Sequence, residues 1–276
     1  MTSTNSFDPR AIPTVPVEID WGHQLTQNLV GLYIPAGPNG LVDLTGNNPA
    51  LIPQSNAFIT RTQAGLGYNH TTGNAGLYVQ SGSILRSTGP QTIVWYGYNY
   101  SSNNGNTSNN ALIAGLASNS HSSAPYLNRC IWNASDQSMI YAGDQNSNRC
   151  AGITYGNLPA GQYTLAATFA ASNVISLFAN GKLVATGTGG AQSYSGDNPI
   201  NIGLESGAGA SYSMTITGSA AWYNRLLTPD ELAWLNIMPF AMIKPTPRRK
   251  LYMLPSGVSI NNSNPQANSG FVYFVT

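Results

Sequence analysis

Residues 211–240 constrain the fold most, because this stretch places a strand pattern directly before a helix with a complete start signal. Met214, Ile216 and Gly218 alternate with hydroxyl-bearing residues, and a nearly continuous apolar run follows at 220–223. Alternation indicates a strand with one solvent-facing side, and an unbroken apolar run indicates burial on both sides. We therefore expect a strand whose first half has one wet side and whose second half is fully buried.

A short helix is expected immediately after this strand. Thr228 is placed to cap it, Pro229 fits the first helical position, and Glu231 stands three residues after Thr228, as a capping box requires. Asp230 adds a second negative charge to the first turn, where unpaired N–H groups make the potential positive. Pro239 ends the helical run. The apolar face of this helix consists of Leu232, Trp234 and Leu235.

Short strand patterns recur along the rest of the chain, separated by turns rich in Gly, Pro, Asn and Ser. The strongest, TIVWYGY at 92–98, is typical of a central strand. Strands that recur about every 8–12 residues are typical of all-β sandwiches and barrels. The other expected strands lie at 29–34, around 68 and 77–79, and at 111–114, 129–132, 138–141 and 198–204.

The clearest hairpin joins residues 174–179 to residues 182–186 through Asn180 and Gly181. Asn-Gly supplies the two positive φ angles of a type I′ turn, whose twist matches that of the flanking strands. Strict alternation then sets the register of the hairpin. The predicted cross-strand pairs are Ala179 with Lys182, Leu177 with Val184, and Phe178 with Leu183.

Composition bounds the size of the body and the kind of partner. The 276 residues are close to the limit of about 250–300 for one core, so we expect a single body at 18–240 with arms at 1–17 and 241–276. Only 8% of residues are charged, against about 25% in an average protein, and the net charge is +1. This balance disfavours nucleic acid as a partner, since phosphate binding needs a positive field. It favours self-assembly, because little like-charge repulsion keeps copies apart.

No membrane segment or signal peptide is expected. No apolar run approaches the about 20 residues of a membrane span, and the first residues, MTSTNSFDPR, are polar. We therefore expect synthesis in a cytoplasm, which keeps thiols reduced. Cys130 and Cys150 each follow an Asn-Arg dipeptide, so a disulfide is possible on spacing, but two free thiols are preferred. Neither cysteine has a CxxC pattern or a nearby histidine that would indicate metal or redox chemistry.

One pair of carboxylates invites a catalytic interpretation. Glu18 and Asp20 stand two residues apart, which on a strand directs both side chains to the same face. Sandwich glycosidases carry Glu-x-Asp-x-x-Glu on one strand, and retaining hydrolysis needs two carboxyls about 5 Å apart. His23 occupies the third position here, so the acid/base residue is missing. We expect a solvated strand entry and no enzymatic activity.

The segment DLTGNN at 43–48 is expected to form a turn in which Asp and Asn side chains bond to their own backbone. Such a loop could hold calcium through oxygen ligands, but a single carboxylate, Asp43, falls short of a site that takes about six to eight ligands. A structural turn is preferred.

The order of these features resembles the laminin-G-like branch of the concanavalin A-like jelly rolls, over residues 28–240. The resemblance implies an all-β, two-sheet jelly-roll sandwich with one short C-terminal helix, to which the chain adds extended terminal arms. Laminin-G calcium sites generally use an acidic residue near the last strands, but residues 212–224 contain none, so we expect no metal and no cofactor. The segments that carry the resemblance are DLTGNN, the central strand at 92–98, LFANGKLVATG, NPINIG and AWYNRLLTPDEL.

The two ends of the chain carry a narrower likeness. EIDWGHQLTQNLVGLYIP and AWYNRLLTPDELAWLNIMPFAMIKPTPRRKLYML are similar to segments of laminin-G-like proteins of tailed bacteriophages and prophages. That likeness implies a non-enzymatic virion protein that decorates the outside of a phage capsid as a dimer or trimer. Its expected partner is the major capsid protein or another virion protein.

The arms are the expected means of attachment. A basic cluster interleaved with prolines is either a partner contact or a solvated linker. A β-prone run at 271–275 is expected to pair with its own sheet or with a neighbouring subunit. The candidate partner-binding residues are Lys244, Arg248, Arg249, Lys250, Phe271, Tyr273 and Phe274.

The alternative function is a carbohydrate-binding module of a phage tail fibre or spike, with host surface glycans as partners. Aromatic side chains suit this role because they offer a flat apolar face together with a polar group. The candidate stacking residues are Tyr98, Tyr100 and Tyr194. A secreted glycosidase ranks last.

Overall fold

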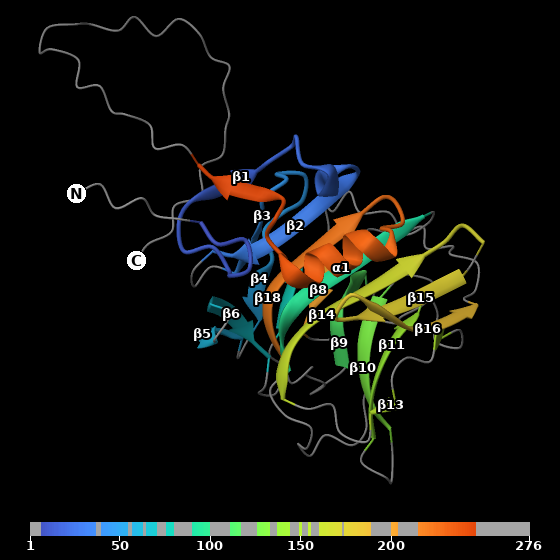
Figure 1. Cartoon of the computed structure of the whole chain (residues 1–276). Coiled ribbons are helices and arrows are strands. Elements are labelled where there is room, and N and C mark those ends of the chain that lie inside the picture. Colours follow the sequence, from blue (N-terminus) through green and yellow to red (C-terminus); the bar gives the residue numbers. More distant parts are fainter. Residues whose placement is uncertain are drawn as a thin grey trace, which may run out of the picture.

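Two antiparallel sheets packed against each other form the body of the protein, and helix α1 (Pro229–Ile237) lies across the outer face of one of them (Figure 1). The structure is a computed structural model. It describes residues 7–36, 40–54, 57–62, 65–70, 76–79, 90–99, 111–116, 126–132, 137–143, 149–150, 154–155, 160–172, 174–188, 200–203 and 215–246.

The sheet beneath α1, here called the front sheet, has nine strands among the described residues. Their bounds are β2 (Leu29–Pro35), β3 (Leu41–Asp43), β5 (Phe58–Thr62), β6 (Gly65–Asn69), β8 (Gln91–Asn99), β14 (Gly161–Phe169), β15 (Val174–Ala179), β16 (Lys182–Thr188) and β18 (Thr215–Tyr223). The strand order is β16-β15-β14-β8-β18-β2-β3, and the β5–β6 hairpin joins through β6 and β18.

The second sheet, here called the back sheet, has eight strands in the described part of the chain. Their bounds are β4 (Ile52–Gln54), β7 (Gly76–Val79), β9 (Ala111–Leu116), β10 (Tyr126–Trp132), β11 (Gln137–Gly143), β12 (Arg149–Cys150), β13 (Thr154–Tyr155) and β17 (Ile200–Ile202). The strand order is β12-β11-β10-β9-β17-β7-β4, with β13 paired to β11. The expected strand regions of the sequence are thus confirmed.

Apolar side chains fill two separate layers. The inter-sheet core lies between the sheets and is built around Trp95 and Trp222, whose neighbour Tyr33 meets Trp222 edge to face at 5.7 Å between ring centroids. The outer core lies between the front sheet and α1, and it includes Tyr96, which meets Phe240 edge to face at 5.5 Å. The front sheet is therefore buried on both faces over much of its width, which explains why β8 is a nearly continuous apolar run.

Strand β18 corrects one expectation. All nine of its residues are buried, including Thr215, Thr217 and Ser219, which alternation had placed on a solvent-facing side. The Thr217 hydroxyl accepts a hydrogen bond from Trp95 Nε1 at 3.0 Å and lies 3.1 Å from His70 Nε2. Because β18 is a central strand between β8 and β2, its hydroxyl residues face covered layers instead of water.

The helix follows the sequence signals closely. Thr228 Oγ1 accepts from Glu231 N at 3.2 Å, and Glu231 Oε2 accepts from Thr228 N at 2.8 Å, so the capping box is complete. Leu232 and Leu235 are buried against the front sheet, while Trp234 is half-buried. The helix ends at Ile237, two residues before Pro239. Its start, its end and its packing face are as predicted.

The hairpin at Asn180 and Gly181 has positive φ angles of 50° and 75°, as the predicted type I′ turn requires. Two of the three predicted cross-strand pairs are present, Ala179 with Lys182 and Phe178 with Leu183. The third is wrong: Leu177 faces Ala185 and not Val184, because an irregularity in the ladder adds one residue on β16 at this point.

The described parts of the two predicted arms pack on the body and on each other. Strand β1 (Val17–Ile19) pairs with β19 (Ile243–Pro245) in a separate two-stranded ladder. Ile12 is buried in the outer core, and Phe240 N donates to Pro9 O at 2.9 Å. How far each arm extends beyond residues 7–17 and 241–246 stays a prediction.

Candidate functional site

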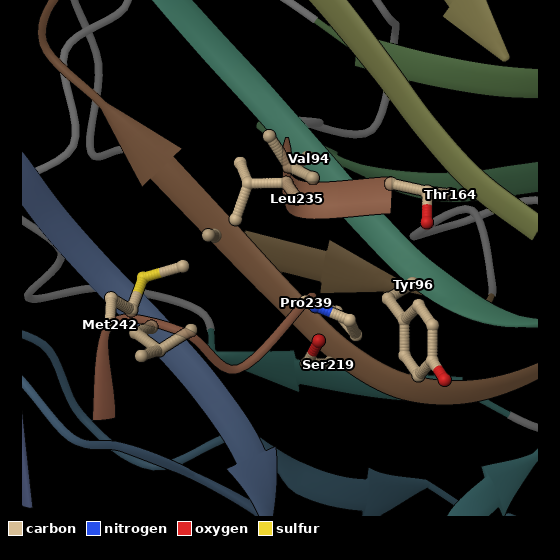
Figure 2. A pocket seen from close by; sticks show the side chains of 9 residues that line it. Val94, Tyr96, Thr164, Ser219, Leu235, Pro239 and Met242 are labelled. Carbon is tan, nitrogen blue, oxygen red and sulfur yellow. The ribbon is translucent and has the colours of Figure 1, made fainter. Parts of the chain in front are cut away.

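A small pocket lies between α1 and the front sheet (Figure 2). Leu235 and Pro239 come from the helix and the segment after it, and Met242 closes one side. The remaining lining residues are Leu32, Val94, Tyr96, Thr164, Ser219 and Ala221, from strands β2, β8, β14 and β18. The pocket has room for about one water molecule, far less than a ligand site usually offers.

Tyr96 supplies the polar side of the pocket, and its hydroxyl is already engaged. It donates to Arg10 O at 3.3 Å and accepts from Gln162 Nε2. Burial, with a smaller contribution from the Asp8 carboxylate, raises the pKa of Tyr96 to about 12, so its phenol stays neutral at physiological pH. The pocket therefore has no group poised for acid or base chemistry, and we interpret it as part of the packing beneath α1.

The two carboxylates considered for catalysis surround one lysine. Glu18 Oε1 lies 3.8 Å and Asp20 Oδ1 lies 3.4 Å from Lys244 Nζ, so both side chains do share a face, as predicted. Glu18 stands directly opposite Lys244 in the β1–β19 ladder. His23, in the position of the missing acid, caps a 3-10 helix, η1 (Gln24–Thr26), with Nδ1 accepting from Leu25 N at 3.2 Å. These residues hold the two terminal segments together.

Asp43 confirms the predicted turn. Its buried carboxylate accepts from three backbone N–H groups, those of Leu32, Thr45 and Asn48, at 2.9 to 3.0 Å. The Thr45 hydroxyl and the Asn48 amide donate two more hydrogen bonds, at 2.6 and 2.8 Å. A carboxylate has about four lone-pair directions, so the turn and strand β2 together use the whole acceptor capacity of Asp43. Little remains with which this carboxylate could bind an ion.

Two further observations bear on function. In the described ranges, no three side chains of His, Cys, Asp or Glu are gathered closely enough to hold a metal ion. Within the same ranges, no helix combines the length and the hydrophobicity needed to cross a membrane.

The order of the strands in the back sheet keeps Cys130 and Cys150 apart. Cys130 on β10 stands opposite Met139 of β11, and Cys150 on β12 stands opposite Ala142 of β11. With β11 between them, their backbones are separated by two strand spacings, about 10 Å, which exceeds the about 7 Å limit for a disulfide. The preferred interpretation as two free thiols is therefore consistent with the strand order.

Of the residues proposed for partner or glycan contact, the structure describes two. Tyr98 is half-buried on β8, opposite Gln162 of β14 and Ile216 of β18. Lys244 is engaged by Glu18 and Asp20. The others lie outside the described residues: Tyr100, Tyr194, Arg248, Arg249, Lys250, Phe271, Tyr273 and Phe274.

One exposed aromatic group was missed in the sequence. Trp21 is 58% exposed, in a β-turn closed by a hydrogen bond from His23 N to Asp20 O at 2.8 Å. The His23 ring meets Trp234 of α1 edge to face, with 5.0 Å between ring centroids. The order Asp-Trp-Gly could have identified Trp21, because it puts a large aromatic residue in a turn position, where core residues are rare.

Comparison with protein families agrees with this architecture. A laminin-G-type family profile, described as the concanavalin A-like lectin/glucanases superfamily, matches residues 71–233, more than half of the 276-residue chain. A comparison with curated proteins gave no match.

Several solved structures share the fold. One is domain 4 of AbnA, a GH43 extracellular arabinanase from Geobacillus stearothermophilus, in complex with arabinotriose; it is 16% identical, with a TM-score of 0.56, covering 76% of this chain and 98% of that one. Another is the binding domain of Paraclostridial Mosquitocidal Protein 1, 16% identical, with a TM-score of 0.55, covering 77% of this chain and 52% of that one.

A third is the binding domain of Botulinum Neurotoxin DC in complex with SialylT, 11% identical, with a TM-score of 0.54, covering 77% of this chain and 52% of that one. The chain thus spans about half the length of the two toxin domains. At these identities the likeness concerns the fold alone, and it confirms the predicted two-sheet jelly-roll sandwich.

Proposed function

This chain belongs to the concanavalin A-like lectin/glucanase superfamily, and from that premise we propose that it is a carbohydrate-binding module that acts without catalysis. The observation that carries the proposal is the nature of the proteins that share its fold. The arabinanase domain is in complex with arabinotriose, and the neurotoxin DC domain is in complex with SialylT. Both are sugar-bound domains of larger proteins that share this sandwich.

The roles of four of the described acids support binding without hydrolysis. Glu18 and Asp20 contact Lys244, and Asp43 is saturated by its own turn and strand β2. Glu231 caps α1 and pairs with Arg225. Glycoside hydrolysis requires two carboxyl groups that flank a sugar bond in a cleft. Each of these carboxylates instead has a structural partner.

The fold relationship favours carbohydrate binding over the capsid-decoration role that we ranked first from the sequence. The fold is shared by domains solved in complex with arabinotriose and with SialylT. A place on a virion, contact with a capsid protein and assembly into dimers or trimers stay predictions. A glycan-binding module on a phage tail fibre or spike is the version of the phage hypothesis that agrees best with the proposal.

A glycan array tests the proposal directly. The chain is displayed as a multimer, because weak single-site affinities add up when several sites engage one surface. We expect binding above background to at least one class of oligosaccharide, lost when the same multimer is heat-unfolded. Bound oligosaccharides recovered afterwards should have their original length, since no hydrolysis is expected. A folded multimer that binds no glycan would overturn the proposal, and shortened oligosaccharides would overturn its non-catalytic part.

A further inference from the structure

We infer that the β-turn at residues 20–23 is the sugar-contacting surface of this protein, with Trp21 as the stacking platform and a neutral sugar as the ligand. The inference rests on the proposed function and gives it a location. The turn surface is defined here as Asp20, Trp21, Gly22, His23 and the ammonium group of Lys244.

Trp21 is exposed although the turn that carries it is held firmly. The side chain is 58% exposed, while Trp95 and Trp222 are 1% and 2% exposed. Asp20 N donates to Met242 O at 2.9 Å, and the Thr26 hydroxyl lies 3.2 Å from Trp21 O. A large indole presented to water on a fixed backbone loses little conformational freedom when a ligand covers it. Such preorganisation is what a binding platform requires.

Polar side chains flank Trp21 in the sequence of the turn. A Cβ atom built on Gly22 would lie 3.7 Å from Asp20 Oδ1, so this carboxylate reaches back over the turn. His23 Nδ1 accepts a hydrogen bond from Leu25 N, which leaves the proton on Nε2. The His23 ring also packs edge to face against Trp234 of α1. An acceptor, a donor and an exposed aromatic side chain thus belong to one four-residue turn. These are the groups that bind the hydroxyl edge and the apolar C–H face of a sugar ring.

The local charge selects the kind of sugar. Glu18 and Asp20 are negative and Lys244 is positive, so the three groups around the turn sum to one negative charge. Asp20 and Glu18 therefore repel an anionic sugar, while the oxygens of Asp20 accept hydrogen bonds from neutral hydroxyl groups. This points to a neutral oligosaccharide rather than a sialylated one.

The same charges argue against a protein partner on this surface. The centres of protein interfaces are depleted of charged residues and bury a broad apolar patch. Here the exposed Trp21 follows Asp20 in the turn, and Lys244 contacts both Asp20 and Glu18. The side chains of Asp20, Glu18 and Lys244 are 43%, 44% and 48% exposed. A small hydroxylated ligand can keep Asp20 and Lys244 hydrogen-bonded, whereas a flat apolar partner would remove the water that solvates them.

The test compares binding of neutral oligosaccharides by the full chain and five variants. Trp21→Ala should lower the affinity about tenfold or more, because the variant loses the apolar contact between one aromatic face and the sugar. Trp21→Phe should retain part of the affinity. Phe58→Ala is the matched control, since Phe58 is 50% exposed on β5, and it should change nothing. Asp20→Asn should weaken binding, while Glu18→Gln, which also loosens the contact with Lys244, should not.

The outcomes separate the location from the function. Binding by the wild type that is lost in Trp21→Ala and kept in Phe58→Ala, with unchanged thermal midpoints, supports the inference. Wild-type glycan binding that Trp21→Ala leaves intact overturns the location but not the proposed function. A preference for sialylated over neutral glycans overturns the ligand class. A change in oligomeric mass in Trp21→Ala without loss of glycan binding would assign the surface to a second copy and would also overturn the inference.

Discussion

Arg225 and Glu231 form a bidentate ion pair that joins the segment after β18 to the first turn of α1. Arg225 Nη1 donates to Glu231 Oε2 at 2.8 Å, and Nη2 donates to Oε1 at 2.7 Å. Arg225 Nε also donates to Gln27 O at 2.8 Å, and its guanidinium lies 5.7 Å from the centre of the Tyr223 ring. Both side chains are mostly buried, at 18% and 15% exposed. One arginine thus ties the helix to the segment that precedes β2.

Replacing Glu231 with glutamine removes the ion pair and weakens the capping box at once. We expect Glu231→Gln to lower the free energy of unfolding by about 1–3 kcal/mol, since hydrogen bonds to charged groups are among the stronger ones. Urea unfolding at neutral pH measures this. Asp230→Asn is the control, because Asp230 lies in the same turn and is exposed. Equal losses in the two variants would show that helix charge, and not the ion pair, is responsible.

The same residue predicts a pH dependence. Hydrogen bonds from Arg225, and to a smaller extent from Thr228, lower the pKa of Glu231 below its ordinary value of 4.5. A carboxyl whose pKa is lowered in the folded state contributes its full stabilisation above the unfolded pKa and loses it as the pH falls through the folded pKa. The stability difference between wild type and Glu231→Gln should therefore be constant above about pH 4.5 and shrink below it. A difference that grows on acidification would contradict the assignment.

Asp43 should stabilise its turn strongly, and the thermal stability of the protein should not depend on calcium. Asp43→Asn keeps the shape of the side chain but replaces one acceptor oxygen with a donor that faces the Asn48 and Thr45 donors. We expect a loss of about 2–4 kcal/mol in unfolding free energy, because several buried donors lose their acceptor. Thermal melts of the wild type with excess calcium and with a chelator should coincide. A calcium-dependent rise in the wild-type midpoint, absent in Asp43→Asn, would revive the metal interpretation of this loop.

Alanine substitutions at two glycines distinguish the cost of backbone strain from the cost of steric crowding. Gly46 and Gly203 both have positive φ angles, 72° and 81°. A Cβ atom on Gly46 would meet nothing within 4 Å, whereas one on Gly203 would lie 2.3 Å from His70 Cγ. We expect Gly46→Ala to cost about 1–2 kcal/mol from left-handed strain alone. Gly203→Ala should cost about 3 kcal/mol or more, because overlap with a buried ring is added. Similar costs in urea unfolding would mean that His70 can move aside.

The helix could be predicted in full because every contact that defines its ends is local. Thr228 and Glu231 are three residues apart, and their reciprocal hydrogen bonds depend on nothing else in the fold. The Asn180-Gly181 turn was predictable for the same reason. The register beyond it was not. Val184 and Ala185 both pack against the inter-sheet core, which strict alternation forbids and which the extra residue on β16 allows.

The burial of the hydroxyl residues of β18 could not be predicted from the sequence. Thr217 is separated by 122 positions from Trp95 and by 147 from His70, the two groups that surround its hydroxyl. Alternation of polar and apolar residues looks the same whether the polar side meets water or a buried partner. The candidate sugar surface escaped prediction for a related reason, since Lys244 lies 224 positions from Asp20. Only the folded chain brings these groups together.

The ladder between β1 and β19 also has a mechanical consequence. Val17 pairs with Pro245, and Thr246 N donates to Pro16 O at 2.9 Å, so the chain enters and leaves this ladder at the same end. A tension applied between residues 16 and 246 acts in the unzipping direction and opens the bonds of the ladder one after another. The long strands of the two sheets carry no load until that short clamp has opened. A pull between these two positions is therefore taken up first by the β1–β19 ladder, before it reaches the two sheets.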